Sequence, residues 1–221
     1  ASKKLFDICS NSRSVKRFIF ASTCSNYGKM EKEEYLNENS PLKPVSLYAE
    51  LKVKFEKYLL ECDTREDFIP TALRFATVYG LSTRMRFDLT VNEFVRDATL
   101  DKELVIYGEQ FWRPYCHVKD LARGCLYVLK SDPTLVKKNV FNVGSTRENY
   151  QKKMLAEEIA NIIPDLKVKY IEKQEDPRDY KVDFSKIENV LGYKIINTVQ
   201  DGIKEIFTAI NENQFIDTYS S

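Results

Sequence analysis

Short apolar runs alternate along the chain with longer segments in which apolar residues recur every three or four positions. This alternation predicts an α/β fold. A strand is predicted at 15–20, where Phe18, Ile19 and Phe20 form a continuous apolar run, which is typical of a strand in a parallel sheet covered on both faces. Further strands are predicted at 71–79, 104–108, 139–144 and 167–171.

The segment after Pro44 has the helical spacing that matters most for function, because its apolar positions 47, 51, 55 and 59 form one stripe. Ser46 is the expected N-cap of this helix. Other helices are predicted at 2–12, after position 88, at 121–130, at 149–163, at 183–191 and at 199–211.

Several details of these helices follow from the same patterns. We expect Leu5 and Ile8, with Cys9, to form the buried side of the first helix. Asp88 and Asp120 are the expected caps of the helices that follow them.

Tyr48 and Lys52 are four residues apart on the helix after Ser46, so they stand on one face about 6 Å apart along the axis. A cation there favours the ionised phenol and lowers the pKa of a tyrosine. Thr23 follows the strand 15–20, and its hydroxyl could reach the same point. This trio predicts a site where Tyr48 moves a proton while Thr23 hydrogen-bonds a substrate oxygen.

The stretch from Ser22-Thr23 to Gly28, joined to Tyr48-x-x-x-Lys52, resembles the catalytic core of the extended short-chain dehydrogenase/reductase family, in its nucleotide-sugar epimerase/dehydratase branch. The resemblance continues in order through 74–80, 107–122, 141–144, 176–180 and 183–193. It implies a Rossmann-type parallel sheet with a small α/β substrate-binding lobe. The implied division assigns 1–80 and 118–146 to the Rossmann part and mainly 81–117 and 147–221 to the lobe.

The resemblance also assigns roles to individual residues. The catalytic residues it implies are Thr23, Tyr48 and Lys52. The implied contacts to NAD, or to NADP, come from Ala21, Ser22, Tyr48, Lys52 and Phe75. The implied contacts to a nucleotide-diphosphate sugar come from Cys24, Ser25, Thr77, Asp88, Leu89, Arg113 and Arg178.

The seven glycines form no Gly-x-Gly-x-x-Gly turn, which a complete dinucleotide-binding half needs after its first strand. We therefore expect the N-terminal part of the family's fold, with the pyrophosphate-binding loop, to be missing from this chain.

Charge and composition limit the kinds of partner that we expect. A net charge of +1 gives no reason to expect nucleic acid, and no apolar run approaches the length of a transmembrane helix. The five scattered cysteines and the single histidine, His117, lack zinc-site spacing, so we expect no metal and a cytoplasmic setting. We interpret His117 as structural. The family resemblance makes a homodimer plausible.

Three functions remain open. The first is a nucleotide-sugar epimerase, because Cys24 and Ser25 stand where the 4,6-dehydratases carry an Asp-Glu pair. A double (3,5-) epimerisation is weakened because the catalytic cysteine of similar enzymes aligns with Ser25. The second is a reductase of a keto nucleotide sugar, or a dehydratase. The third is a non-catalytic remnant that only binds a sugar nucleotide.

Overall fold

The computed structural model describes residues 1–31, 33–174, 176, 178–215 and 217. Its main sheet holds three parallel strands in the order β1 (Arg17–Thr23), β3 (Ile69–Phe75) and β7 (Asn139–Val143). Their carboxyl ends are in register, since Thr23 is paired with Phe75 and Phe75 with Val143. The sheet is parallel, as the sequence predicted, and β3 and β7 are mostly buried, whereas β1 is mostly half-buried.

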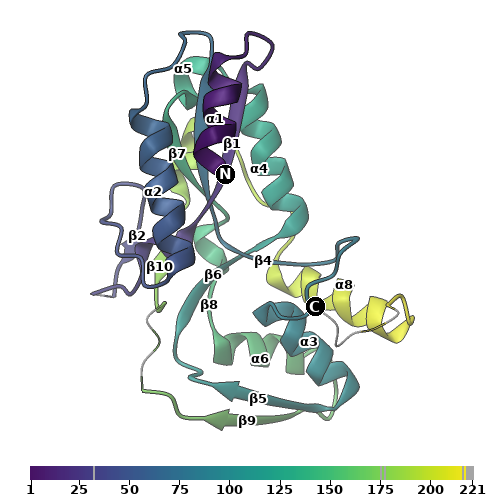
Figure 1. The fold of residues 1–221 in the computed structure, drawn as a ribbon. Helices are drawn as coiled ribbons and strands as arrows, with labels where there is room; N and C mark the ends of the chain where they lie inside the picture. Colours follow the sequence, from purple (N-terminus) through teal and green to yellow (C-terminus); the bar gives the residue numbers. More distant parts are fainter. Residues whose placement is uncertain (32, 175, 177, 216, 218–221) are drawn as a thin grey trace.

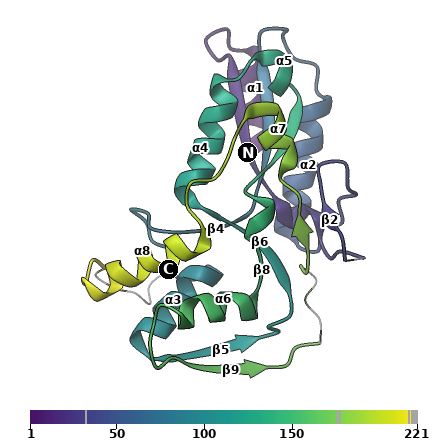
Figure 2. The same ribbon diagram turned by 180° about the vertical axis from the view of Figure 1, so that it is seen from behind.

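Helices cover both faces of this sheet (Figures 1 and 2). Phe18 and Phe20 of β1 pack against the aromatic cluster of α1 (Ser2–Asn11) and α2 (Leu47–Glu61). Ile19, which points the other way, packs in the core that includes α4 (Val118–Lys130), α5 (Pro133–Val136) and α7 (Ser185–Leu191).

A second layer of structure has its own core and lies below the main sheet in Figure 1. It contains the sheet β4 (Thr77–Tyr79), β6 (Trp112–His117) and β8 (Asn149–Gln151), and the parallel pair β5 (Glu103–Tyr107) and β9 (Lys167–Ile171). Three helices pack around these strands, namely α3 (Thr90–Leu100), α6 (Lys152–Ala160) and α8 (Val199–Asn211).

The division of the chain into a Rossmann part (1–80 and 118–146) and a substrate-binding lobe (mainly 81–117 and 147–221) stays a prediction. Residues of 180–193 contribute to the core of the main sheet, although they fall within the segment expected to belong mainly to the lobe. Several elements were not predicted: the 3-10 turns η1 (Cys24–Tyr27) and η2 (Thr146–Glu148), the short helix α5, the strand β6, and the two-residue strands β2 (Tyr35–Leu36) and β10 (Lys181–Val182). Strands this short carry no periodic pattern.

The buried side of α1 was predicted wrongly. Leu5 and Ile8 are 56% and 58% exposed, whereas Phe6 is fully buried. The Phe6 ring packs edge-on against Phe18 and Phe68, and these aromatic contacts fix how α1 lies on the sheet.

The helix starts were predicted with mixed success. Ser46 caps α2 as expected, accepting a hydrogen bond from the Ala49 amide. Asp88 does not cap α3, because its carboxylate pairs with Arg86. Asp120 does not cap α4 either, since His117 accepts the Lys119 amide there, and His117 is structural as interpreted.

The predicted helix over 149–163 is shorter than expected, because its first three residues form β8. Those residues pair antiparallel with β6, and Arg113 lies opposite Tyr150.

Candidate active site

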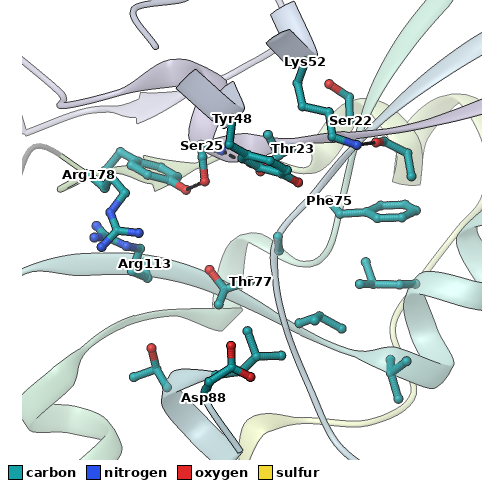
Figure 3. Close-up of a pocket in the computed structure, with 18 of the residues that line it drawn as sticks. Ser22, Thr23, Ser25, Tyr48, Lys52, Phe75, Thr77, Asp88, Arg113 and Arg178 are labelled. Atoms are coloured by element: carbon teal, nitrogen blue, oxygen red, sulfur yellow. Dashed lines mark hydrogen bonds between the residues drawn. The ribbon is translucent and has the colours of Figure 1, made fainter. Parts of the chain in front are cut away.

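A cavity of about 710 Å³ opens at the carboxyl ends of β1 and β3, between the main sheet and the second layer (Figure 3). The carboxyl ends of parallel strands are where α/β folds bind ligands. Lining residues come from β1, α2, the segment 75–78, the start of α3, α4, the start of α6 and the loop before β10.

Thr23, Tyr48 and Lys52 all line this cavity, so the sequence-predicted trio lies on one side of the sheet. Thr23 ends β1 and its hydroxyl oxygen accepts the Ser25 amide at 3.1 Å. The Tyr48 side chain is 57% exposed, and its hydroxyl hydrogen-bonds none of the residues that the structure describes.

The Lys52 amino group donates to the Ala21 carbonyl oxygen at 2.5 Å and lies 5.5 Å from the centre of the Tyr48 ring. Burial lowers the pKa of Lys52. The cation therefore lies against the ring face of Tyr48, and two of its three N–H donors remain for other partners.

Ala21, Ser22 and Phe75, the other predicted cofactor contacts, also line the cavity. The Ser22 hydroxyl, however, donates to Glu56 at 2.7 Å, which leaves its backbone rather than its side-chain donor for a ligand.

The predicted substrate contacts Ser25, Thr77, Asp88, Leu89, Arg113 and Arg178 also line the cavity. Ser25 lies beside Thr23 and Tyr48, whereas Thr77 and Asp88 lie across the cavity from them (Figure 3). Figure 3 shows the side chains of Arg113 and Arg178 turned toward each other at one end of the cavity. The Ser25 hydroxyl lies 3.3 Å from that of Tyr180.

Arg113 is held by its surroundings. It is 9% exposed, donates to Asp176 at 2.9 Å, and lies over the Tyr180 ring at 5.5 Å. Burial raises the pKa of Asp176, but Arg113, the Arg178 amide and Arg178 outweigh it and hold that pKa below its usual range. Asp176 thus stays charged and orients both arginines. Pro177, which lies between Asp176 and Arg178 in the sequence, is outside the described residues.

Comparison with known proteins identifies the family. The sequence model of the NAD dependent epimerase/dehydratase family matches residues 1–144. The chain belongs to this family.

The epimerase/dehydratase relatives agree with that assignment. An uncharacterized UDP-glucose epimerase of Bacillus subtilis (strain 168), YtcB, is 31% identical over 211 residues, which cover 92% of this chain and 63% of the relative. The UDP-N-acetylglucosamine 4-epimerase of Methanobrevibacter ruminantium M1, solved with UDP-N-acetylmuramic acid, is 25% identical with a TM-score of 0.81, over 96% of this chain and 68% of that one.

A further structure, MoeE5 with UDP-glucuronic acid and NAD, superposes with a TM-score of 0.81 at 23% identity, over 96% of this chain and 70% of that one. Similar proteins also include a UDP-glucuronic acid decarboxylase and a dTDP-glucose 4,6-dehydratase. The chain spans about 60% of the length of the first curated relatives it matches. Family membership therefore fixes the fold but leaves the reaction open.

Cys24 is the one predicted substrate contact that does not line the cavity, so this prediction is corrected by the structure. Its thiol is 1% exposed, does not line the cavity, and donates to the Arg74 carbonyl at 3.2 Å. Burial raises the pKa of Cys24 well above its usual range. The chain turns into η1 at this residue, which directs Cys24 into the core between Thr23 and Ser25, both on the cavity side.

Several residues that line the cavity were not predicted from the sequence, among them the polar or titratable side chains Cys125, Lys152, Asp176 and Tyr180. Lys152 lies inside the helix predicted over 149–163, and Asp176 and Tyr180 flank the predicted arginine contact Arg178.

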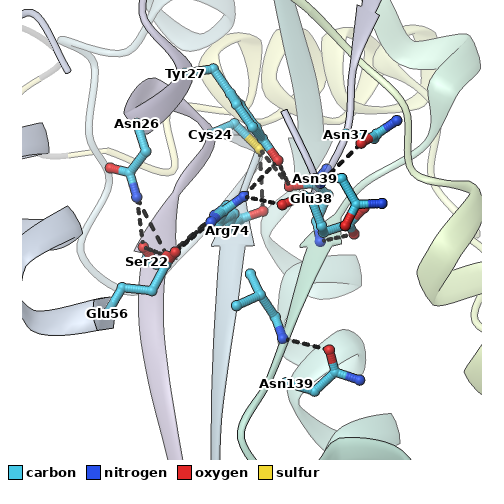
Figure 4. Close-up of polar contacts among 12 residues, drawn as sticks. Ser22, Cys24, Asn26, Tyr27, Asn37, Glu38, Asn39, Glu56, Arg74 and Asn139 are labelled. Carbon is cyan, nitrogen blue, oxygen red and sulfur yellow. Dashed lines mark hydrogen bonds and ion pairs between the residues drawn. The ribbon is translucent and has the colours of Figure 1, made fainter. Parts of the chain in front are cut away.

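A buried polar cluster next to the cavity was also missed (Figure 4). Glu56, one helical turn after Lys52, pairs with Arg74 of β3 and accepts the Ser22 hydroxyl. Arg74 also donates to the Tyr27 hydroxyl at 2.9 Å, which donates in turn to Asn142 at 2.8 Å. These bonds fasten α2 to the strands directly beside the cavity.

No group of three or more His, Cys, Asp or Glu side chains arranged to hold a metal ion occurs among the described residues. No helix within the described part of the chain is long and apolar enough to cross a membrane.

Proposed function

We propose that this chain carries the catalytic and substrate-binding part of a nucleotide-sugar epimerase. The observation that supports it is the layout of one cavity, with Thr23, Tyr48 and Lys52 at one end and Arg113 and Arg178 at another. Proton-transfer groups and a guanidinium pair in one cavity fit a sugar joined to a diphosphate.

The residues present fit the nicotinamide end of NAD. Lys52 has free N–H donors, the Ala21 and Ser22 backbone and Phe75 line the same end, and the names of similar structures include NAD or NADPH. NAD, when bound, takes up a hydride from the sugar carbon and returns it.

The side chains of this chain would handle the proton and the developing charge. Tyr48 would accept the proton of the sugar hydroxyl as the carbon loses its hydride, so that a ketone forms without building charge on oxygen. The Thr23 hydroxyl would donate to that oxygen, and Lys52 would hold positive charge beside the phenol ring. Tyr48 would give the proton back to the same oxygen when the ketone is reduced from its other face, which would complete the epimerisation.

The epimerase is favoured over the dehydratase by the residues that follow Thr23. Cys24 and Ser25 stand where the dehydratases carry an Asp-Glu pair, and neither side chain is a carboxylate that could serve acid–base elimination. Cys24 is in addition buried in the core. A keto-sugar reductase is the second enzyme candidate, because it uses the same trio.

Cofactor accounting distinguishes the two enzymes. An epimerase leaves bound NAD⁺ unchanged over many turnovers of a UDP-sugar, whereas net consumption of NADPH with a 4-keto nucleotide sugar would establish the reductase instead.

The non-catalytic alternative has its own test. Calorimetry on this chain with NAD⁺ and with UDP-, GDP-, CDP- and dTDP-sugars measures both halves of the site. Affinity for a nucleotide sugar together with affinity for NAD⁺ supports the enzyme, and nucleotide-sugar affinity alone supports a binding protein.

We also propose a homodimer in a reducing compartment such as the cytoplasm. Exposed apolar side chains on α1 and α2 support the dimer, namely Leu5, Ile8, Leu47 and Leu51. The five free cysteines support the compartment. Sedimentation of the L47E/L51E variant, compared with the parent chain, tests the dimer.

A further inference from the structure

Lys152 stands at the first position of α6, and the fold brings it to the arginine end of the cavity. Strand β8 pairs antiparallel with β6 so that Tyr150 lies opposite Arg113. Helix α6 begins two residues later, which places Lys152 among the residues that line the cavity.

The surroundings of Lys152 are rich in positive charge. Burial lowers the pKa of Lys152; Asp176 raises it, while Arg113, Lys173 and Arg178 lower it further. Glu93 of α3 also faces it, since Lys152 acts to lower the pKa of that carboxyl. Like charges gathered in a half-buried cavity repel one another, and an anion bound between them removes that cost.

Lys152 has donors to spare. Its amino group donates to the Tyr107 carbonyl oxygen at 2.7 Å, which is a neutral partner that uses one of three N–H bonds. Among the described residues no carboxylate lies within ion-pair distance of Lys152. Arg113 and Arg178, in contrast, share Asp176.

We propose that Lys152 is a third anion-binding side chain of this cavity, which acts with Arg113 and Arg178 on a diphosphate. Arg113 and Arg178 share the carboxylate of Asp176, and Lys152 adds a positive charge beside them. The two phosphate groups of a diphosphate can contact these cations at the same time, whereas a monophosphate offers only one phosphate group. That this diphosphate joins a nucleoside to a sugar rests on the proposed function.

Binding of UDP, UMP and inorganic pyrophosphate to four forms of the chain tests this role. The forms are the parent, Lys152→Met, Lys152→Arg and Lys153→Met, whose lysine is exposed, adjacent in sequence and outside the cavity. We expect Lys152→Met to weaken UDP and pyrophosphate about tenfold, the loss typical of one charge-assisted hydrogen bond, and to weaken UMP much less. Lys152→Arg should keep most of the affinity, and Lys153→Met should match the parent.

Three outcomes separate this proposal from the proposed function. Equal UDP affinity of the parent and Lys152→Met overturns the role of Lys152 and leaves the nucleotide-sugar site standing. Pyrophosphate binding that depends on Lys152, without affinity for any nucleotide sugar, supports the anion site and rejects the proposed function. Equal losses for UDP and UMP, with a lowered melting temperature, show that Lys152 only supports the fold through Tyr107, and this also overturns the proposal.

Discussion

Two groups of polar side chains lie next to each other near the carboxyl ends of β1 and β3, and they differ in how far their hydrogen-bonding capacity is used. In the buried cluster, Arg74 is 4% exposed and bonds Glu56 and the Tyr27 hydroxyl. In the cavity, Tyr48 is more than half exposed and its hydroxyl is bonded to none of the described residues.

The contrast shows how residues of the same chemical type take different roles. Buried polar groups must be paired to offset their loss of water, and the pairs that Arg74 forms with Glu56 and Tyr27 stabilise the arrangement of α2 against the strands. Among the described residues, the side-chain oxygen of Asn26 in this cluster has no hydrogen-bond partner. Polar groups in the cavity keep donors and acceptors free, and these can be satisfied by a ligand. Both clusters touch the catalytic elements, since Glu56 and Lys52 are neighbours on α2.

The largest effect should come from Tyr48→Phe, which tests the cavity side of the contrast. Removal of the hydroxyl takes away the proton acceptor, and we expect turnover of a UDP-sugar to fall by about 10²- to 10⁴-fold. Calorimetric affinity for the nucleotide sugar should stay within about threefold of the parent, because the arginine end is untouched. A matching loss of affinity would show that Tyr48 holds the substrate rather than moving its proton.

Glu56→Ala tests the buried side. Removing one partner leaves the Arg74 guanidinium buried without its carboxylate, which costs about 3–5 kcal/mol of unfolding free energy. Urea denaturation followed by circular dichroism measures this loss. Glu50→Ala, an exposed position on the same helix, is the control and should change stability by less than about 0.5 kcal/mol. A Glu56 variant as stable as that control would contradict the claim that the buried pair of Glu56 and Arg74 stabilises the fold.

Arg113→Ala should weaken nucleotide-sugar binding about 10- to 100-fold, because a charge-assisted contact is lost. Arg113→Lys should recover only part of it, since an ammonium lacks the planar fork of a guanidinium. Calorimetry of both variants measures the effect, and denaturation checks that Asp176, left without Arg113, has not unfolded the loop. A change in stability without a change in affinity would remove Arg113 from the binding site.

Asp120 extends the contrast to a second saturated carboxylate. Burial raises its pKa, but hydrogen bonds from Asn197, the Ile196 amide and Arg123 outweigh this and bring the pKa below its usual 3.8. A depressed carboxyl pKa contributes stability that is present above pH 3.8 and is lost as the pH falls through the folded-state value. Asp120→Asn should lower stability by about 1–3 kcal/mol near neutral pH and flatten this acid-side decline. Denaturation curves from pH 7 to pH 3 measure both, and an unchanged decline would contradict the assignment.

Cys24→Ala should have the smallest effect. Its thiol is buried away from the cavity, so we expect a loss of about 1 kcal/mol of stability and no change in nucleotide-sugar affinity. Ser25→Ala, on the cavity side, is the matched comparison. Weaker nucleotide-sugar binding by the Cys24 variant at unchanged stability would show that Cys24 contacts the substrate after all.

The sequence predicted the elements whose patterns are strong and local. The apolar run of β1, the stripe of α2 with its Ser46 cap, and the Tyr48–Lys52 spacing all match the structure. Most of the predicted ligand contacts reached one cavity because a family motif carries tertiary information that periodicity lacks.

The errors arise where distant contacts decide. Leu5 is exposed because the rings of Phe18 and Phe68 pack against Phe6 instead. Cys24 turns inward because a 3-10 turn interrupts the alternation of the strand. Lys152 enters the cavity only because three residues before it join a strand instead of a helix.

The segment from Phe75 to Val78 runs along the cavity and belongs to both sheets, because β3 ends at Phe75 and β4 starts at Thr77. Phe75 is in register with Thr23, and Thr77 is in register with Tyr115, two residues beyond Arg113. The span between the proton-transfer end and the phosphate end is therefore set by covalent backbone rather than by the packing of two movable bodies. A single inserted residue at Ala76 would shift one end relative to the other by about 3.3 Å, the rise of one residue in a strand, and would put a sugar of normal length out of reach of Tyr48.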